Sequence, residues 1–291
     1  MNYSSFSYTP KDLRRLPARP AQSHKGTFGR VLCVGGSVGM CGAVYLAAKA
    51  AYRTGAGLVR ILTVKENRPV LQTLLPEAIV TVYDADAPEA DVIAEAEAWA
   101  DVLVIGCGMG VNRASRTVLS TLLRISKKPK VLDADALTLL SRNPSLLKYA
   151  KGAILTPHPK EASRLCGLDP EEILADADTV AYDLAQKHRA ICVLKTHRTV
   201  ISDGGPFLYR NASGNSGMAT GGSGDVLAGI LGGILAQARN GELDPFGTAC
   251  LGVYIHGLCG DAAAKRLTEY SVMASDLIDA LPEVLALAEQ S

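Results

Sequence analysis

The stretch Thr220-Gly-Gly-Ser-Gly-Asp225, which runs directly into the apolar segment 226–235, decides how the rest of the chain is interpreted. Glycines let bare backbone N–H groups converge without Cβ clashes, and a helix start adds roughly half a positive charge, so the loop favours an anion. A carboxylate at the same point would repel that anion. Asp225 therefore indicates a base that takes a proton from a hydroxyl attacking phosphorus, while the loop holds the charge on the transferred phosphoryl group. The alternative is a flexible turn in which Asp225 is an ordinary helix N-cap.

The bulk composition excludes several classes of protein. With 291 residues and 48% hydrophobic residues, the chain can bury the core of one large α/β domain or two small ones. Thirty basic and 29 acidic residues give a net charge of +1, which gives no electrostatic case for a nucleic acid or a membrane as partner. The apolar runs are too short to span a bilayer. Seven cysteines form no CxxC pair and no zinc spacing, and we interpret them as reduced core thiols of a cytoplasmic protein.

Short apolar runs alternate with helical segments along most of the chain. Continuous apolar strands between helices predict a mainly parallel sheet covered on both faces. No linker or repeat interrupts the pattern, so we expect one domain after an N-terminal arm. The predicted strands are 31–34, 58–64, 78–82, 102–105, 130–132, 153–155, 191–194 and 199–202; the predicted helices are 43–53, 90–100, 115–125, 136–141, 178–188, 225–238, 246–265 and 274–287.

Five loops follow predicted strands, and ligands of such sheets bind beyond the carboxyl ends of the strands. Two of these loops are rich in glycine, with Gly35, Gly36, Gly39 and Gly42 in the first and Gly106, Gly108 and Gly110 in the second. The spacing in the first loop matches neither a Walker loop nor a GxGxxG fingerprint. A plain turn explains the first loop about as well as ligand contact does, and the second nearly as well.

The third loop carries Asp133 and Asp135. We favour Asp135 as the cap of the helix that follows, and we leave open whether Asp133 helps to hold a magnesium-bound phosphate through water.

The fourth and fifth loops carry polar side chains. His158 stands between two prolines, and this stiff setting favours ligand contact over a structural role, whereas Glu161 is interpreted as first-turn helix charge. The fifth loop, 195–199, is rich in donors that could wrap a nucleotide phosphate or its adenosine edge, although an exposed polar hairpin fits equally well. His256 lies in an apolar run, and we expect a core histidine with one backbone partner.

Together these segments resemble the ribokinase superfamily and, within it, the ADP/ATP-dependent NAD(P)H-hydrate dehydratases, the carbohydrate-kinase-related branch. The resemblance covers nearly the whole chain. It rests on His24-Lys-Gly-Thr-Phe-Gly-Arg-Val-Leu-Cys-Val-Gly-Gly-Ser37, on 42–58, on Ile105-Gly-Cys-Gly-Met-Gly110, on Leu132-Asp-Ala-Asp-Ala-Leu137, on Thr156-Pro-His-Pro-Lys-Glu161 and on 215–229.

This resemblance implies a ribokinase-like three-layer αβα sandwich with a mainly parallel central sheet, in one domain over 24–291 after an arm over 1–23. It implies Asp225 as catalytic base and an anion hole at 222–224. The second glycine motif commonly has proline where this chain has Cys107, which changes loop stiffness more than chemistry. The implied residues are Lys195, Thr196, His197, Arg198, Thr199 and Gly224 for the nucleotide; Ala43, Gly110, His158 and Asp225 for the substrate; and Gly222, Ser223 and Gly224 for the anion hole.

The implied activity is the ADP-dependent dehydration of hydrated NADH and NADPH (NADHX and NADPHX), with Mg²⁺ as cofactor and metal ligands unknown. The motifs do not separate ADP from ATP as co-substrate, and we favour ADP because the short single-domain form is similar to the bacterial members. The family resemblance also implies a homotetramer and an NAD(P)H-hydrate epimerase on a separate chain.

Two alternatives stay open. One is a small-molecule kinase of the same superfamily, acting on a thiazole, a pyrimidine or a sugar alcohol and releasing a stable phosphorylated alcohol. The other is a nucleotide-sensing binding protein without turnover.

Overall fold

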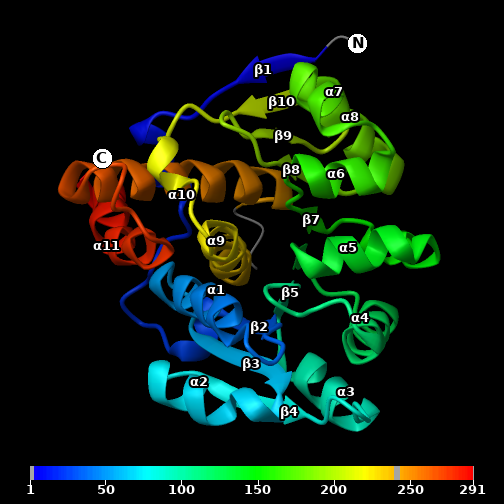
Figure 1. Cartoon of the computed structure of the whole chain (residues 1–291). Helices are drawn as coiled ribbons and strands as arrows, with labels where there is room; N and C mark the ends of the chain where they lie inside the picture. Colours follow the sequence, from blue (N-terminus) through cyan, green and yellow to red (C-terminus); the bar gives the residue numbers. More distant parts are fainter. Residues whose placement is uncertain (1–2, 239–242, 291) are drawn as a thin grey trace.

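The computed structural model describes residues 3–238 and 243–290, which fold around a ten-stranded sheet (Figure 1). The strands lie in the order β1-β10-β9-β8-β7-β6-β5-β2-β3-β4, and all pair in parallel except β8 with β9 and β9 with β10. The mainly parallel sheet is thus confirmed. Its strands are β1 (Ser4–Phe6), β2 (Arg30–Val34), β3 (Leu58–Val64), β4 (Ile79–Tyr83), β5 (Val102–Ile105), β6 (Lys130–Leu132), β7 (Ile154–Leu155), β8 (Ile191–Leu194), β9 (Val200–Ser202) and β10 (Phe207–Arg210).

Helices cover both faces of the sheet, so the strands are buried on both sides. Successive residues of β2 point to opposite faces: Val31 and Cys33 belong to one hydrophobic core, Leu32 and Val34 to the other. The first core packs under α1 (Cys41–Arg53), α2 (Arg68–Leu74), α9 (Ser223–Gln237), α10 (Pro245–Leu267) and α11 (Ala274–Gln290); the second packs under α3 (Ala90–Trp99), α4 (Arg113–Ile125), α5 (Asp135–Arg142), α6 (Pro159–Cys166), α7 (Pro170–Ala175) and α8 (Ala177–His188).

Helix α9 lies in the middle of the first core and packs unusually closely on its neighbours. A Cβ at Gly229 would lie 2.1 Å from the backbone oxygen of Ala47 in α1, and one at Gly232 would lie 2.4 Å from a methyl of Val104 in β5. Only glycine permits both approaches. The apolar segment after Asp225 is therefore a buried helix held between another helix and the sheet.

The predicted strands occur within one residue of their expected ends, and the three C-terminal helices are also confirmed. Strands β1 and β10 and helices α2 and α7 were not predicted; of α6 only the start was predicted, through Glu161 in its first turn. The N-terminal arm pairs with the sheet edge through β1 and continues into the short helix η1 (Pro10–Arg15), where Leu13 is buried. Within 3–238 and 243–290, no helix is long and apolar enough to cross a membrane.

Candidate functional site

The two glycine-rich loops pack on each other at the carboxyl edge of the sheet. Gly36 N–H donates to the Cys107 carbonyl over 2.9 Å, and Ser37 N–H donates to the Gly108 carbonyl over 2.6 Å. A Cβ at Gly35 would lie 2.1 Å from the Cys107 oxygen, so this contact requires glycine. The loops thus form one surface beside the start of α9.

The start of α9 offers unpaired backbone donors. The helix begins at Ser223 with Gly222 as N-cap at φ 90°, so Asp225 is the third helical residue and the N-cap alternative is wrong. In the part of the chain that the structure describes, the N–H groups of Gly222, Gly224 and Asp225 have no acceptor, whereas Ser223 N–H has a long bond of 3.4 Å to the Thr220 carbonyl. Such first-turn donors are suited to an anion.

Asp225 lies in a carboxylate pair beside a thiol. Ligand atoms of Cys107, Asp133 and Asp225 lie within 4.8 Å of one another. Burial and then the Asp133 charge raise the pKa of Asp225 from 3.8 to about 6, against the lowering effects of a Cys107 thiol hydrogen bond and of Lys195. At neutral pH the carboxylate is thus mostly ionised yet still basic enough to accept a proton, as a general base requires.

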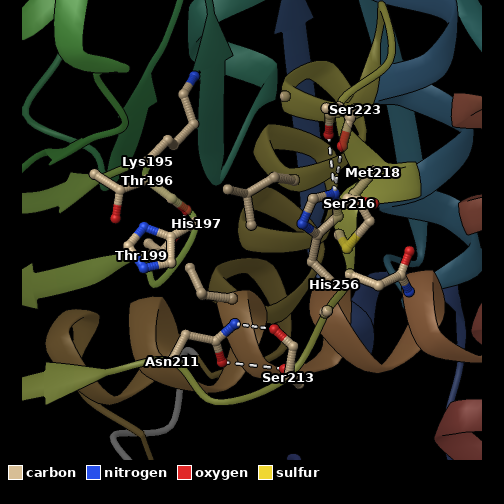
Figure 2. A pocket seen from close by; sticks show the side chains of 17 residues that line it. Lys195, Thr196, His197, Thr199, Asn211, Ser213, Ser216, Met218, Ser223 and His256 are labelled. Carbon is tan, nitrogen blue, oxygen red and sulfur yellow. Dashed lines mark hydrogen bonds between the residues drawn. The ribbon is translucent and has the colours of Figure 1, made fainter. Parts of the chain in front are cut away.

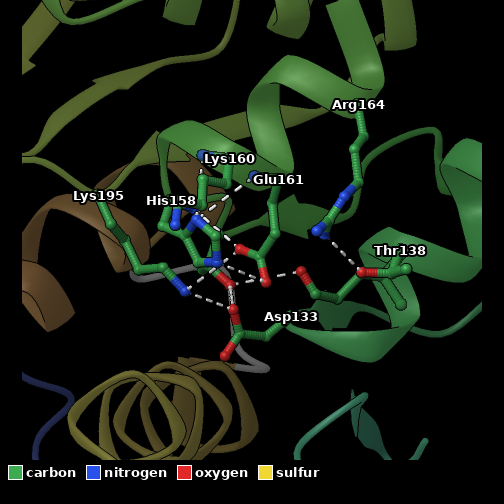
Figure 3. A network of polar contacts seen from close by, with 9 residues as sticks. Asp133, Thr138, His158, Lys160, Glu161, Arg164 and Lys195 are labelled. Carbon is green, nitrogen blue, oxygen red and sulfur yellow. Dashed lines mark hydrogen bonds and ion pairs between the residues drawn. The ribbon is translucent and has the colours of Figure 1, made fainter. Parts of the chain in front are cut away.

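An ion pair between Asp133, which lies beside Asp225, and Lys195 connects the carboxylate pair to the fifth loop (Figure 3). Lys195 Nζ and Thr156 Oγ1 both donate to Asp133 Oδ1, each over 2.7 Å. Burial disfavours the Lys195 charge, but Asp133 and Glu161 outweigh it and raise its pKa. Asp133, whose role the sequence left open, therefore holds a charged Lys195. A Cβ at Gly224 would lie 3.4 Å from Lys195 Nζ, so this ammonium group adjoins the start of α9.

His158 is the N-cap of α6, and hydrogen bonds with the first turn of that helix hold its side chain in place. Its Nδ1 accepts from Lys160 N–H over 3.1 Å and Glu161 N–H over 3.4 Å, and its own N–H donates to Glu161 over 2.9 Å. Burial and then Lys195 lower the pKa of His158. The neutral ring therefore carries its proton on Nε2, 3.4 Å from Glu161 Oε1. Glu161 is buried in this network rather than being only first-turn helix charge.

Asp135 does not cap the helix, which corrects the sequence interpretation. Helix α5 begins at Asp135, its N-cap is Ala134, and no side chain caps it. The Asp135 carboxylate instead accepts the Gly110 N–H over 2.7 Å. This bond fixes the second glycine loop at the position that the family resemblance assigns to the substrate.

A cavity of about 560 Å³ opens between the β8–β9 connection and helices α9 and α10 (Figure 2). Among the residues expected to bind the nucleotide, Lys195, Thr196, His197, Thr199 and Gly224 line it, together with Ser223 of the expected anion hole. Arg198 and Gly222 do not line this cavity. The complete lining is Lys195, Thr196, His197, Thr199, Asn211, Ser213, Gly214, Asn215, Ser216, Met218, Ala219, Ser223, Gly224, Leu227, Val253, His256 and Gly257.

The far wall of the cavity, 211–219 with part of α10, was not among the residues expected to bind the nucleotide, although 215–219 belong to a segment that carries the family resemblance. His256 is buried and donates from Nε2 to the Ser223 carbonyl over 3.0 Å, which confirms the expected core histidine with a backbone partner. Burial lowers the pKa of His256 to about 4, so the ring is neutral. The same ring also lines the cavity, a role that was not foreseen.

The residues expected to bind the substrate lie outside this cavity: His158 and Gly110 are on strand-end loops, whereas Ala43 is in α1 and Asp225 in α9. His158 connects through Glu161 to Lys195, whose Nζ is 3.9 Å from Glu161 Oε2. Ala43 lies against the second glycine loop, with its Cβ 2.8 Å from the position of a Cβ at Gly108. Gly110 is on the same loop. Asp225 thus stands between the cavity and these loops.

Comparison with known proteins identifies the family. The family model described as NAD(P)H-hydrate dehydratase matches residues 31–283. An ADP-dependent (S)-NAD(P)H-hydrate dehydratase of Neisseria meningitidis is 40% identical over 90% of this chain and 84% of its own length. The chain spans about half the length of the bifunctional NAD(P)H-hydrate repair enzymes among its curated relatives.

Two solved structures support the same family assignment. A ribokinase-like superfamily protein of Enterococcus faecalis has a TM-score of 0.86 and 33% identity, covering 99% of this chain and 97% of its own. An ADP/ATP-dependent NAD(P)H-hydrate dehydratase of Bacillus subtilis, co-crystallised with ATP and Mg²⁺, has a TM-score of 0.82 and 30% identity, covering 96% and 97%. The fold is ribokinase-like, as expected, and the chain belongs to the NAD(P)H-hydrate dehydratase family.

Proposed function

We propose that the chain catalyses the ADP-dependent dehydration of (S)-NADHX and (S)-NADPHX back to NADH and NADPH. The observation that carries this proposal is the position of Asp225, a carboxylate with a pKa of about 6 beside three unpaired backbone N–H groups. A base and an anion site at one helix start suit the transfer of a phosphoryl group to a hydroxyl.

The hydrated ring carries a hydroxyl on the carbon next to the ring nitrogen, and hydroxide is a poor leaving group. Asp225 accepts the hydroxyl proton while the oxygen forms a bond to the terminal phosphorus of ADP, and the P–O bond to AMP breaks. The nitrogen lone pair then expels phosphate, and loss of a ring proton restores the dihydronicotinamide. Phosphorylation therefore serves elimination, and the products are AMP, free phosphate and the reduced dinucleotide.

The nucleotide is assigned to the cavity, with the loop Lys195 to Thr199, including Arg198, and Gly224 as its contacts. Lys195 lies where the cavity meets Asp133 and the start of α9, so its ammonium group would neutralise the transferred phosphoryl charge together with the amides of Gly222, Ser223 and Gly224. Ala43, Gly110, His158 and Asp225 would contact the hydrated dinucleotide.

Mg²⁺ is proposed as cofactor. Asp133 fits it best: Oδ1 is occupied by Lys195 and Thr156, while Oδ2 faces the Gly224 side, 3.7 Å from the position of a Cβ there. A carboxylate oxygen is a ligand that Mg²⁺ prefers, with phosphate oxygens and water as the others, whereas the nearby Cys107 thiol is not. When bound, the ion would supply charge neutralisation at the phosphates.

The remaining features of the proposal concern the whole protein. We propose a cytoplasmic homotetramer, a single catalytic domain over 24–291 after the arm 1–23, and an NAD(P)H-hydrate epimerase that acts separately on the same substrate pool. The longer relatives are named bifunctional NAD(P)H-hydrate repair enzymes, and this name supports a second repair activity beside the dehydratase.

The test is to mix the protein with NADHX or NADPHX, Mg²⁺ and either ADP or ATP. Recovery of reduced-nicotinamide absorbance with stoichiometric release of phosphate, faster with ADP than with ATP, is expected. Accumulation of a stable phosphorylated product would instead identify a kinase. Nucleotide binding without turnover would identify a sensor, and either result would overturn the proposal.

A further inference from the structure

A second cavity lies between the start of α4 and the end of α5, outside the nucleotide cavity. It measures about 300 Å³ and is lined by Val111, Asn112, Arg113, Arg116, Leu139, Arg142 and Asn143. None of these residues was singled out in the sequence. Figure 1 shows α4 and α5 as neighbours on the same face of the sheet.

The lining carries three positive charges and no acidic side chain. Arg113, Arg116 and Arg142 are exposed, and within 3–238 and 243–290 their guanidinium groups have neither an ion-pair partner nor a hydrogen-bond acceptor. The chain as a whole has a net charge of only +1. Three unpaired cations around one hollow repel one another, so a bound anion would relieve that repulsion.

The two helix ends at the cavity oppose each other. The start of α4, where the Asn112 side chain accepts the Ser115 N–H over 2.9 Å, contributes a partial positive charge, and the end of α5 contributes a partial negative charge of similar size. The Asn143 amide donates to the Leu139 carbonyl of α5 over 2.8 Å. The preference for an anion therefore comes from the three guanidinium groups. Guanidinium groups match phosphate oxygens with paired N–H donors.

The cavity adjoins the proposed substrate loop. Val111, in its lining, follows Gly110 directly, and Gly110 is held by Asp135 at the carboxyl edge of the sheet. A dinucleotide that contacts Gly110 would therefore lie next to residues that line the cavity. Nucleotide phosphate at the other cavity cannot account for these arginines, because none of them lines it.

We propose that the cavity between α4 and α5 binds a phosphate group of the dinucleotide substrate through Arg113, Arg116 and Arg142. The proposal rests on the proposed function for the identity of the dinucleotide. The phosphate is either the pyrophosphate bridge, which NADHX and NADPHX share, or the 2′-phosphate, which only NADPHX carries. In the second case the cavity determines preference for the phosphorylated substrate.

The variants Arg113→Gln, Arg116→Gln and Arg142→Gln remove one charge each from exposed positions without burying a new group. Arg124→Gln, on the last turn of the same helix α4 and outside the cavity, is the matched control. Two measurements are made on each variant: kcat and KM with NADHX and NADPHX, and equilibrium binding of NADH and NADPH by nicotinamide fluorescence.

Each cavity variant should raise KM and Kd about fivefold to tenfold with little change in kcat, because it contacts a part of the substrate remote from the reacting bond. An effect on NADPH and NADPHX alone supports the 2′-phosphate, and an equal effect on both dinucleotides supports the pyrophosphate. Affinities equal to those of wild type and Arg124→Gln overturn the inference. If the wild type fails to dehydrate either substrate but the variants still lose dinucleotide affinity, the proposed function fails and the phosphate site stands.

Discussion

Replacing Asp225 by asparagine should stabilise the fold while it lowers turnover strongly. The folded protein raises the pKa of this carboxyl group from 3.8 to about 6, chiefly through burial and the charge of Asp133. A carboxyl whose pKa is raised on folding costs nothing below its unfolded pKa, where both states are protonated. The cost grows as pH rises towards 6 and is constant above it. Asparagine has a similar shape and no charge, so it escapes that cost.

The size of the gain follows from the shift. The difference between 3.8 and about 6 is about two pKa units, and each unit corresponds to about 1.4 kcal/mol. The upper value is therefore about 3 kcal/mol. Asp225 is only half-buried, and screening by water reduces the expected gain in unfolding free energy to about 1–2 kcal/mol above pH 6. Turnover should fall by about 10²–10⁴-fold, the range typical of a lost general base.

Urea unfolding at pH 8 and pH 4.5, at one protein concentration, measures this directly. Wild type and variant should differ by about 1–2 kcal/mol at pH 8 and by much less at pH 4.5. Protonation of His256 and other shared groups cancels in the comparison. Asp183→Asn, at an exposed position on α8, is the control and should show no such pH dependence. A stability difference that is equal at the two pH values would refute the reasoning about Asp225, whatever happens to turnover.

Three further substitutions test the neighbours of Asp225. Lys195→Met removes a charge that lowers the pKa of Asp225, so the acidic limb of the pH–rate profile should move to higher pH and KM for ADP should rise about tenfold; an unmoved limb contradicts this. Cys107→Ala removes a thiol donor that also lowers the pKa of Asp225, so steady-state kinetics should show a move of the same limb to higher pH, at least as large as that in Lys195→Met, with an unchanged KM for ADP; a changed KM would place Cys107 at the nucleotide. Gly106→Ala puts a Cβ 1.9 Å from the Asp133 carbonyl oxygen at φ +128°, which should lower the unfolding free energy by about 2–4 kcal/mol; near-wild-type urea unfolding would show that the loop yields easily.

The central strands could be predicted because each is an uninterrupted apolar run buried on both faces. Strands β1 and β10 carry no such run. Strand β1 contains two serines, and Phe207 in β10 is 56% exposed. Strand β1 is defined by its pairing with β10 across 203 residues (Ser4 with Phe207), whereas β10 also pairs with β9. Local pattern cannot report such a partner.

The candidate site also has parts that could be predicted from the sequence and parts that could not. The loops at the strand ends were foreseen because parallel strands bring their carboxyl ends to one edge. The hydrogen-bond partners of individual side chains in these loops were not foreseen. Asp135 was taken as a local cap because capping needs only its neighbours, whereas its actual partner, the Gly110 N–H, lies 25 residues earlier in the chain. Arg113 and Arg116 are neighbours on α4, but Arg142 comes from α5, and only the tertiary fold brings it to the same cavity.

The close packing of α9 against α1 and β5 bears on which parts of the molecule can move during turnover. An atom of Ala47 or of Val104 lies where a Cβ on Gly229 or Gly232 would be, so α9 is packed directly on α1 and β5. A shift of α9 would therefore have to carry its neighbours with it. We expect closure over bound substrates, where it occurs, to involve the segments around the cavity, such as 196–199 and 211–219, rather than the helix that carries Asp225.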